Sequence, residues 1–146
     1  HRRGPRRFRL VTPIVVLDAS AAAEMFAQTA LGRALLGLVP AERNWWVPDH
    51  FHIETSGAIR RMLQGDLISA NRATEALNRL LAFPSAVAQS RPLISEAWTH
   101  RNNVTIHDAV YVVLAQHLDA PLLTADRKLA AAPNLPVQVL HLSVAE

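Results

Sequence analysis

The sequence predicts an α/β fold in which a parallel sheet of four to five strands lies between two layers of helices. Short apolar runs alternate with helical patterns along the whole chain, which is typical of strands joined by crossover helices. Residues 14–17, IVVL, are continuously apolar, as expected of a strand buried on both faces. Half of the 146 residues are hydrophobic and none is cysteine, so we expect a proper core without disulfides or thiolate chemistry.

The alternation gives the order of the elements. Strands are expected over residues 14–17, 45–47, 86–89, 122–123 and 137–140. Helices are expected over residues 21–26, 30–39, 48–64, 69–81, 92–100, 106–118 and 127–132. Pro48 is expected to open the third helix, because its missing N–H costs nothing in a first turn. Trp45 and Trp46 are expected in the core or at an interface rather than stacked on bases.

The positive net charge of +3 comes from one end of the chain. Five of the fifteen basic residues lie in the first nine positions, which leaves ten basic against twelve acidic residues in the remainder. We expect residues 1–10 to be a disordered basic tail or an extension from an upstream start, able at most to contact phosphates non-specifically. The apolar run after Arg6-Arg7 is too short for an export signal, and no run approaches the roughly 18 residues of a membrane helix. A cytoplasmic protein without membrane contact is therefore expected.

Four acidic residues are predicted to meet at one edge of the sheet. Asp18 follows the first strand, Asp126 follows the fourth, and Asp108 lies in the first turn of the helix over residues 106–118. Glu54 follows Ile53 on what we take to be the apolar side of the third helix, where an unpaired acid is costly. Ligands bind outside the carboxyl ends of such strands. A divalent cation would offset the repulsion among the acids, and oxygen ligands favour Mg²⁺ or Mn²⁺ over zinc. Such a site suits phosphodiester hydrolysis by a metal-activated water.

Each acid also has a purely structural interpretation. Asp108 fits a capping box with Thr105, and Asp126 fits the N-cap of the next helix. Asp18 fits a turn after a strand, and Glu54 fits an exposed helix position if the helical phase is different. Only their joint pattern favours a metal site.

Four segments, VVLDAS, HIETSGAIRRML, TIHDAVYVVLA and APLLTADRKLA, resemble in order and spacing the PIN-domain ribonucleases, and more narrowly the VapC toxins of bacterial toxin–antitoxin pairs. The resemblance covers residues 14–140 and implies a single PIN domain over residues 11–146, with a PIN-like α/β/α sandwich. It implies an endoribonuclease dependent on Mg²⁺ or Mn²⁺ that cuts RNA, often tRNA or rRNA. A cognate VapB-type antitoxin would hold it inactive. A homodimer is implied as well, and we expect its contact on the helices over residues 48–81.

The resemblance also implies residue roles. Asp18, Glu54, Asp108 and Asp126 would be the metal-binding and catalytic acids, and Ser20 and Thr124 would support them. His107 is a departure, because many relatives have tyrosine before this aspartate. The candidate phosphate contacts are basic residues that solvated helix faces would explain equally well: Arg60, Arg61, Arg127 and Lys128. His50 and His52, two positions apart on a helix, point to different faces and are not expected to bind metal.

Two other functions remain open. A catalytically silent PIN-like module would bind RNA or a protein partner and cut nothing. A phosphoacceptor receiver also gathers acids around Mg²⁺, but it needs an aspartate after the middle strand and a lysine after the last. Gln89-Ser90 and His141-Leu142-Ser143 stand at those places.

Overall fold

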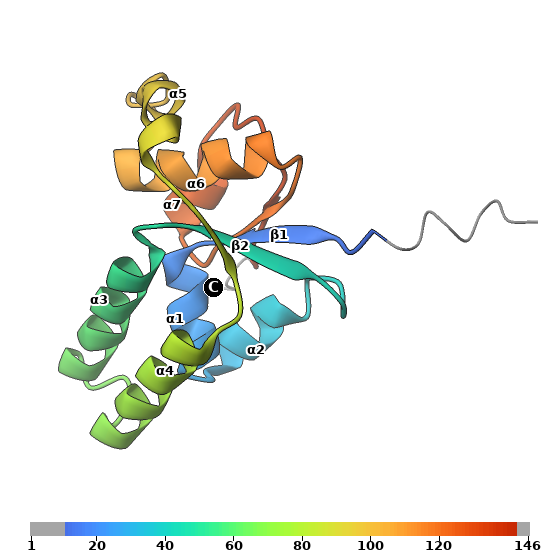
Figure 1. Cartoon of the computed structure of the whole chain (residues 1–146). Coiled ribbons are helices and arrows are strands. Elements are labelled where there is room, and N and C mark those ends of the chain that lie inside the picture. The colour runs from blue at the N-terminus through green and yellow to red at the C-terminus, as the bar shows by residue number, and fades with distance from the viewer. Residues whose placement is uncertain (1–10, 143–146) are drawn as a thin grey trace, which may run out of the picture.

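The centre of the computed structural model, which describes residues 11–142, is the strand β1 (Ile14–Leu17). It is the middle strand of a five-stranded parallel sheet of order β3-β2-β1-β4-β5 (Figure 1). Its side chains from Val15 to Leu17 are fully buried, which confirms the prediction of a strand covered on both faces. The other strands are β2 (Asn44–Pro48), β3 (Ala86–Ala88), β4 (Leu122–Leu123) and β5 (Val139–Leu140). The predicted basic tail lies outside the described residues.

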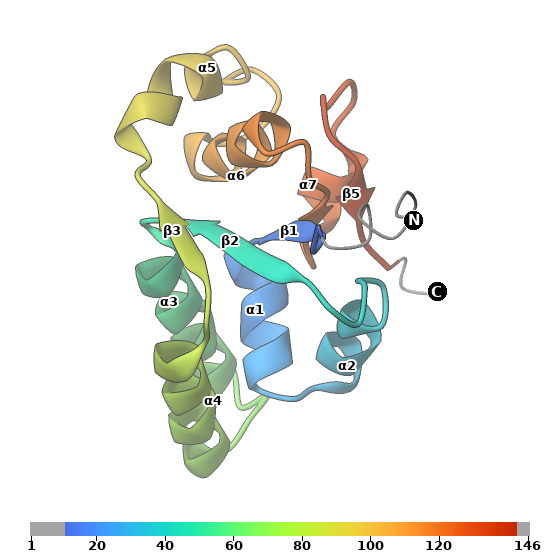
Figure 2. The same cartoon turned by 45° about the vertical axis from the view of Figure 1, so that its right-hand side comes forward.

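Helices cover both faces of the sheet, so the predicted three-layer α/β/α architecture is confirmed. One face carries α1 (Ala19–Phe26), α2 (Ala30–Leu36), α3 (Phe51–Gln64) and α4 (Ala70–Ala82) (Figure 2). The other carries the 3₁₀ turn η2 (Arg91–Leu93), α5 (Ile94–Trp98) and α6 (Ile106–His117). A short helix, α7 (Arg127–Ala131), follows β4.

The helix α6 forms most of the core on its side of the sheet. Residues 109–115 are all buried, and the helix packs against β1, β2 and β4. A helix that is apolar all round must be covered all round, and here α5 and the sheet together cover it. The predicted buried helix is confirmed.

The strand order reverses its direction of growth between β1 and β4. The chain adds β2 and β3 on one side of β1, and then β4 and β5 on the other. The backbone N–H of Asp18 donates to the carbonyl of Leu123, so the carboxyl ends of β1 and β4 lie side by side. Such a switch point leaves a crevice outside the carboxyl ends of the two strands. Asp18 and Asp126 come directly after these ends.

The third helix begins later than predicted. Pro48 ends β2 and lies opposite Ala88 of β3, and α3 begins only at Phe51. The predicted place of Ile53 on the apolar side of this helix is wrong as well, because Ile53 is 78% exposed. The buried residues of α3 are Phe51, Thr55, Ile59 and Met62, and Ile53 lies two positions from Phe51, on a different side of the helix.

Other element limits differ for local reasons. The predicted helix over residues 92–100 is divided into η2 and α5, with Pro92 inside the 3₁₀ turn. The last strand is limited to Val139–Leu140, because its partner β4 offers only two residues for pairing. Within the described part of the chain, no helix combines the length and apolar character needed to cross a bilayer.

Candidate functional site

All four predicted acids line one pocket at the carboxyl ends of β1 and β4. The pocket has a volume of about 330 Å³. Asp18, Glu54, Asp108 and Asp126 contribute four carboxylates, and Arg61 is the one cation in its lining. Each acid comes from a different element, so only the fold brings them together. The lining of this pocket therefore holds more carboxylates than its one guanidinium can balance.

Asp18 is held by a network that joins β1 to β4. It is the N-cap of α1, and its Oδ1 accepts hydrogen bonds from the backbone N–H of Ala21 at 2.9 Å and from the Ser20 hydroxyl at 2.8 Å. The Thr124 hydroxyl donates to Oδ2. Ser20 Oγ in turn accepts from the backbone N–H of Ala125 at 3.0 Å. Ser20 in the first turn of α1 and Thr124 directly after β4 thus fix the Asp18 carboxylate.

The other two aspartates also belong to helix starts. Asp126 is the N-cap of α7, and its Oδ1 accepts from the backbone N–H groups of Lys128 and Leu129. Thr105 is the N-cap of α6, and its hydroxyl accepts from the backbone N–H of Asp108 at 3.2 Å. The N-cap interpretation of Asp126 is therefore correct, and the Thr105 half of the predicted capping box is present. Capping does not compete with a functional role, because Asp108 and Asp126 also line the pocket.

Glu54 is paired with two side chains. The Tyr111 hydroxyl donates to its Oε1 at 2.9 Å, and His50 Nε2 lies 3.3 Å from the same oxygen. His50 Nε2 also lies 3.3 Å from the carbonyl of His107. Both neighbours of this nitrogen are acceptors, so it carries a hydrogen, while the buried Nδ1 has no partner within residues 11–142. Glu54 is thus oriented from α6 and from the turn before α3.

Burial and mutual repulsion raise the pKa of two of the acids. Burial raises the pKa of Asp18 to about 7, in spite of its hydrogen bonds and with a contribution from Asp108. The pKa of Asp108 is raised by burial, and next by the neighbouring charge of Asp126. The pKa of Tyr111 is also raised, by burial and then by Glu54, so this hydroxyl stays a hydrogen-bond donor. Carboxyl groups with raised pKa values are suited to bind a cation, because the cation offsets the cost of their negative charges.

The donor chemistry of the pocket fits a hard divalent cation, since carboxylate oxygens are the ligands that Mg²⁺ and Mn²⁺ prefer. As placed, however, no three carboxylate or imidazole groups within residues 11–142 are close enough to hold one ion. Asp126 keeps Oδ2 and Glu54 keeps Oε2 without a hydrogen bond within that same part of the chain. These oxygens are available without breaking a cap or the contact with Tyr111.

Two of the four predicted phosphate contacts lie near the acids. Arg61 lines the acid pocket, and Lys128 lines an adjoining hollow. Arg60 and Arg127 line neither of them.

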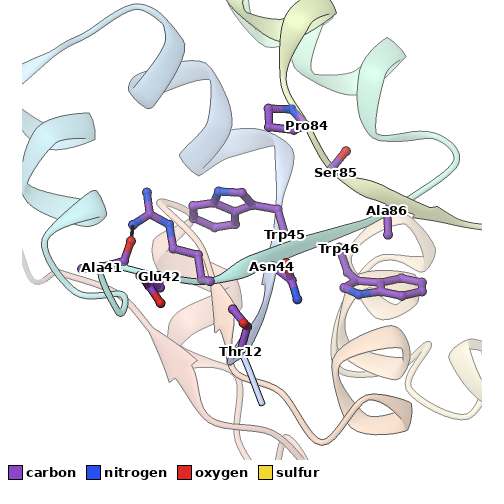
Figure 3. A pocket seen from close by; sticks show the side chains of 10 residues that line it. Thr12, Ala41, Glu42, Asn44, Trp45, Trp46, Pro84, Ser85 and Ala86 are labelled. Atoms are coloured by element: carbon purple, nitrogen blue, oxygen red, sulfur yellow. Dashed lines mark hydrogen bonds between the residues drawn. The ribbon is translucent and has the colours of Figure 1, made fainter. Parts of the chain in front are cut away.

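A larger hollow of about 970 Å³ lies at the opposite, amino ends of the strands (Figure 3). Trp45, Trp46, Asn44 and Ser85 line it, and Glu42 is its one carboxylate. Trp45 is only 7% exposed and its ring lies under the Arg43 guanidinium, so the prediction that it belongs to the core is confirmed. This hollow has a single carboxylate in its lining, whereas the smaller pocket has four.

Sequence reasoning missed two residues of the site. Tyr111 lies in the predicted apolar helix over residues 106–118, and the signal for its role is that a buried tyrosine needs a partner for its hydroxyl. The prediction that His50 and His52 point to different faces assumes that both lie on a helix. His50 in fact lies in the turn before α3, where it reaches Glu54.

Comparison with known proteins identifies the family and agrees with the fold. Residues 15–135 match the PIN domain family. The chain is 38% identical to ribonuclease VapC1 of Mycobacterium tuberculosis over 125 residues, which cover 85% of this chain and 94% of the relative. It is 35% identical to ribonuclease VapC12 of the same species over 117 residues, covering 80% and 90%.

Solved structures are similar in fold. The crystal structure of M. tuberculosis VapC20, a toxin that cleaves the Sarcin-Ricin loop, matches with a TM-score of 0.59 at 18% identity, over 85% of this chain and 98% of that one. VapBC-5 of M. tuberculosis, a member of the VapBC family of toxin–antitoxin systems, matches with a TM-score of 0.54 at 16% identity, over 88% and 98%. The observed strand order also differs from the 2-1-3-4-5 order of receiver domains, which sets that alternative aside. The chain belongs to the PIN-domain family, among the VapC-type ribonuclease toxins.

Proposed function

We propose that this ribonuclease is a Mg²⁺- or Mn²⁺-dependent endoribonuclease whose catalytic site is the acid pocket. The observation that carries the proposal is the lining of this pocket, with four carboxylates against one guanidinium. Four acids that face one another are costly in a protein that binds no cation. A cation in the pocket would offset this cost, and the four acids would then hold the cation for the reaction.

Asp18, Asp108 and Asp126 are the proposed metal-binding residues, and Glu54 completes the set. The side chains would have to draw together around an ion, because no three of them can hold one as placed. An ion held by these residues would supply an activated water for in-line attack on the phosphorus and would stabilise the leaving oxygen. The family resemblance implies a product with a 5′-phosphate.

The remaining residues orient these acids and the substrate. The hydroxyls of Ser20 and Thr124, which lie 3.2 Å apart, donate to the two oxygens of the Asp18 carboxylate and hold it in place. Tyr111 and His50 hold one oxygen of Glu54, which leaves the other oxygen free for the ion. Arg61, from the same helix as Glu54, is suited to contact a phosphate of the RNA.

RNA, tRNA or rRNA in particular, is the proposed substrate, and a VapB-type antitoxin is the proposed partner. The named activity of the VapC relatives supports the first, and the VapBC complexes among the structural neighbours support the second. A protein with such a substrate would act in the cytoplasm. We also propose a homodimer formed through α3 and α4.

The test is cleavage of a mixed tRNA and rRNA pool by the purified chain with Mg²⁺, Mn²⁺ or EDTA. Cleavage is expected with either metal and is expected to stop in EDTA. Asp18→Asn and Asp108→Asn should each reduce the rate by on the order of 100-fold or more. Asp66→Asn is the matched control, because Asp66 is exposed in the turn after α3.

Sequencing of the fragment ends would identify the target. If the folded wild-type chain cuts no RNA with either metal, the proposal is wrong and the silent binding module is favoured. If both variants cut as fast as the wild type, the site has been assigned to the wrong residues.

A further inference from the structure

A second hollow adjoins the acid pocket. It has a volume of about 390 Å³ and shares Asp108 and Asp126 with that pocket. Its other walls are residues 101–105, which precede α6, and Lys128-Leu129 at the start of α7. The shared pair of acids thus stands between the two hollows. A chain molecule that crosses the acid pocket past Asp108 and Asp126 enters the second hollow next.

The character of the second hollow differs from that of the acid pocket. Apart from the shared acids, its charged side chains are Arg101 and Lys128, and its polar ones include the amides of Asn102 and Asn103. Guanidinium and ammonium groups bind phosphates, while a side-chain amide can pair with a base edge through two hydrogen bonds. The lining therefore combines both kinds of group that a nucleotide requires.

The wall formed by residues 101–105 is well ordered by hydrogen bonds. The backbone N–H groups of Asn103 and Val104 both donate to the carbonyl of His100. Asn103 Nδ2 donates to the carbonyl of Pro133 at 2.8 Å, which ties this wall to the chain that follows α7. Because this wall is already ordered, little conformational entropy is lost when a ligand binds, which favours specific recognition.

Arg101 is positioned by an exposed tryptophan. Its guanidinium carbon lies 5.1 Å from the centre of the Trp98 ring, and Nη1 donates to the Trp98 carbonyl at 3.0 Å. Trp98 is 56% exposed, which is unusual for so large an apolar side chain. A stacked arginine keeps its remaining N–H groups free for an anion, and exposed aromatic faces are suited to unpaired bases.

Asn102 and Lys128 have uncommitted side chains. Neither makes a side-chain hydrogen bond or ion pair within residues 11–142, whereas the Asn103 amide is engaged. The backbone N–H of Lys128 donates to Asp126 Oδ1 at 2.8 Å, so the position of this residue relative to the shared acids is fixed.

We propose that the second hollow is a subsite for single-stranded RNA. It holds the nucleotide next to the scissile phosphate. Arg101 and Lys128 contact the adjacent phosphate, and Asn102 reads the base and so determines cleavage specificity. Trp98 acts by positioning Arg101. This assignment rests on the proposed function of the acid pocket and adds to it the part that selects the substrate.

The first experiment measures binding without cleavage. Fluorescence anisotropy with hexanucleotides of A, C or U is recorded in Mg²⁺ buffer on the Asp18→Asn background, because Asp18 does not line the second hollow. Arg101→Ala should weaken binding of all three probes by about 5- to 10-fold and lower the salt slope by about 0.7. Arg101→Lys should keep the salt slope. Asn102→Ala should change the ratio of the three affinities by about 3- to 10-fold.

The matched controls are Arg33→Ala and Asn71→Ala. Both residues are exposed on helices, Arg33 on α2, beyond the far end of α1, and Asn71 in the first turn of α4. Neither control should change affinity, base preference or salt slope. Thermal melts of every variant confirm that the changes in binding come from folded protein.

The second experiment maps cleavage sites by sequencing fragment ends with Asn102→Ala in the otherwise unchanged chain. The base preference should relax at one position flanking the cut. Unchanged cleavage sites together with unchanged probe affinities in Asn102→Ala and Arg101→Ala would overturn the subsite and leave the hollow to a protein partner. If Asp18→Asn still cuts RNA, the assignment of the acid pocket fails, but the affinity ratios still decide the subsite. If none of the probes binds measurably, the proposed subsite is overturned as well.

Discussion

Asp18 combines two tasks that conflict in the absence of a cation. Its carboxylate caps α1 and joins β1 to β4, and this requires a buried acceptor. The same burial, 3% exposure beside Asp108, makes the negative charge costly. The cost falls on the folded state alone, because the unfolded chain leaves the carboxylate in water.

Asp18→Asn should therefore stabilise the metal-free protein above pH 7. The folded pKa of about 7 lies above the unfolded value of about 3.9, so wild-type stability falls as pH rises between these values. Three pKa units correspond to about 4 kcal/mol, and relaxation of the pocket makes about 1–3 kcal/mol the expected gain. Asparagine remains a good N-cap, so α1 is retained.

Thermal melts in EDTA at pH 5 and pH 8 check this prediction. The variant should exceed the wild type at pH 8 and should lose most of this advantage at pH 5. Added Mn²⁺ should raise the Tm of the wild type and leave the variant nearly unchanged, since the variant lacks the charge that attracts the ion. A variant less stable than wild type in EDTA at pH 8 would contradict the account of Asp18.

Two glycines in helices differ in how closely the neighbouring atoms approach them. At Gly32 of α2 a Cβ would lie 2.2 Å from the carbonyl oxygen of Glu24, so the backbones of α1 and α2 meet there. At Gly57 of α3 a Cβ would meet only Arg61 Nη1, at an ordinary 3.7 Å. The first glycine is required by packing, and the second is tolerated.

Alanine at these two positions should have opposite effects on the free energy of unfolding. Gly32→Ala should destabilise by about 2 kcal/mol or more, because α1 and α2 must separate. Gly57→Ala should stabilise by about 0.5–1 kcal/mol through helix propensity. Urea titrations measure both, and equal effects in the two variants would show that the α1–α2 contact is softer than its geometry implies.

The sheet is the structure that assembles the site for the molecule as a whole. Asp18 and Asp126 are 108 positions apart, and they share a pocket because β1 and β4 are parallel neighbours at the switch in strand order.

The outer face of α4 carries exposed apolar side chains. Leu77 is 38% exposed and Leu81 is 70% exposed, and they are four residues apart on one side of that helix.

The double variant Leu77→Lys/Leu81→Lys should disrupt the proposed homodimer. Burying two ammonium groups in an apolar contact is costly, and we expect the dimer dissociation constant to rise by about 100-fold or more. Sedimentation velocity over a concentration series measures it. Leu36→Lys on α2, where Leu36 is 37% exposed, is the matched control and should leave the assembly unchanged. A wild-type chain that stays monomeric throughout would contradict the dimer.

Local patterns were enough to predict the fold class. The apolar run of residues 14–17, the apolar helix over residues 106–118 and the capping residues Thr105 and Asp126 depend on neighbours in sequence, and all were predicted. The convergence of Asp18 and Asp126 also followed, because parallel strands share their carboxyl edge. By contrast, the end of β2 at Pro48 depends on its pairing with β3, which no local pattern reveals.

The sequence alone determined that this chain is an α/β protein of the PIN family with acids at the carboxyl edge of its sheet. Hydrophobic periodicity and helix caps are short-range properties, and the family motifs fix the order of the acids. Only the tertiary structure decided how Glu54 is held, because Tyr111 of α6, 57 positions away, reaches it from the layer on the other face of the sheet. It alone also brought Arg101 and Asn102 beside Asp108 and Asp126, since side chains that share a pocket through loop geometry leave no periodic trace in the sequence.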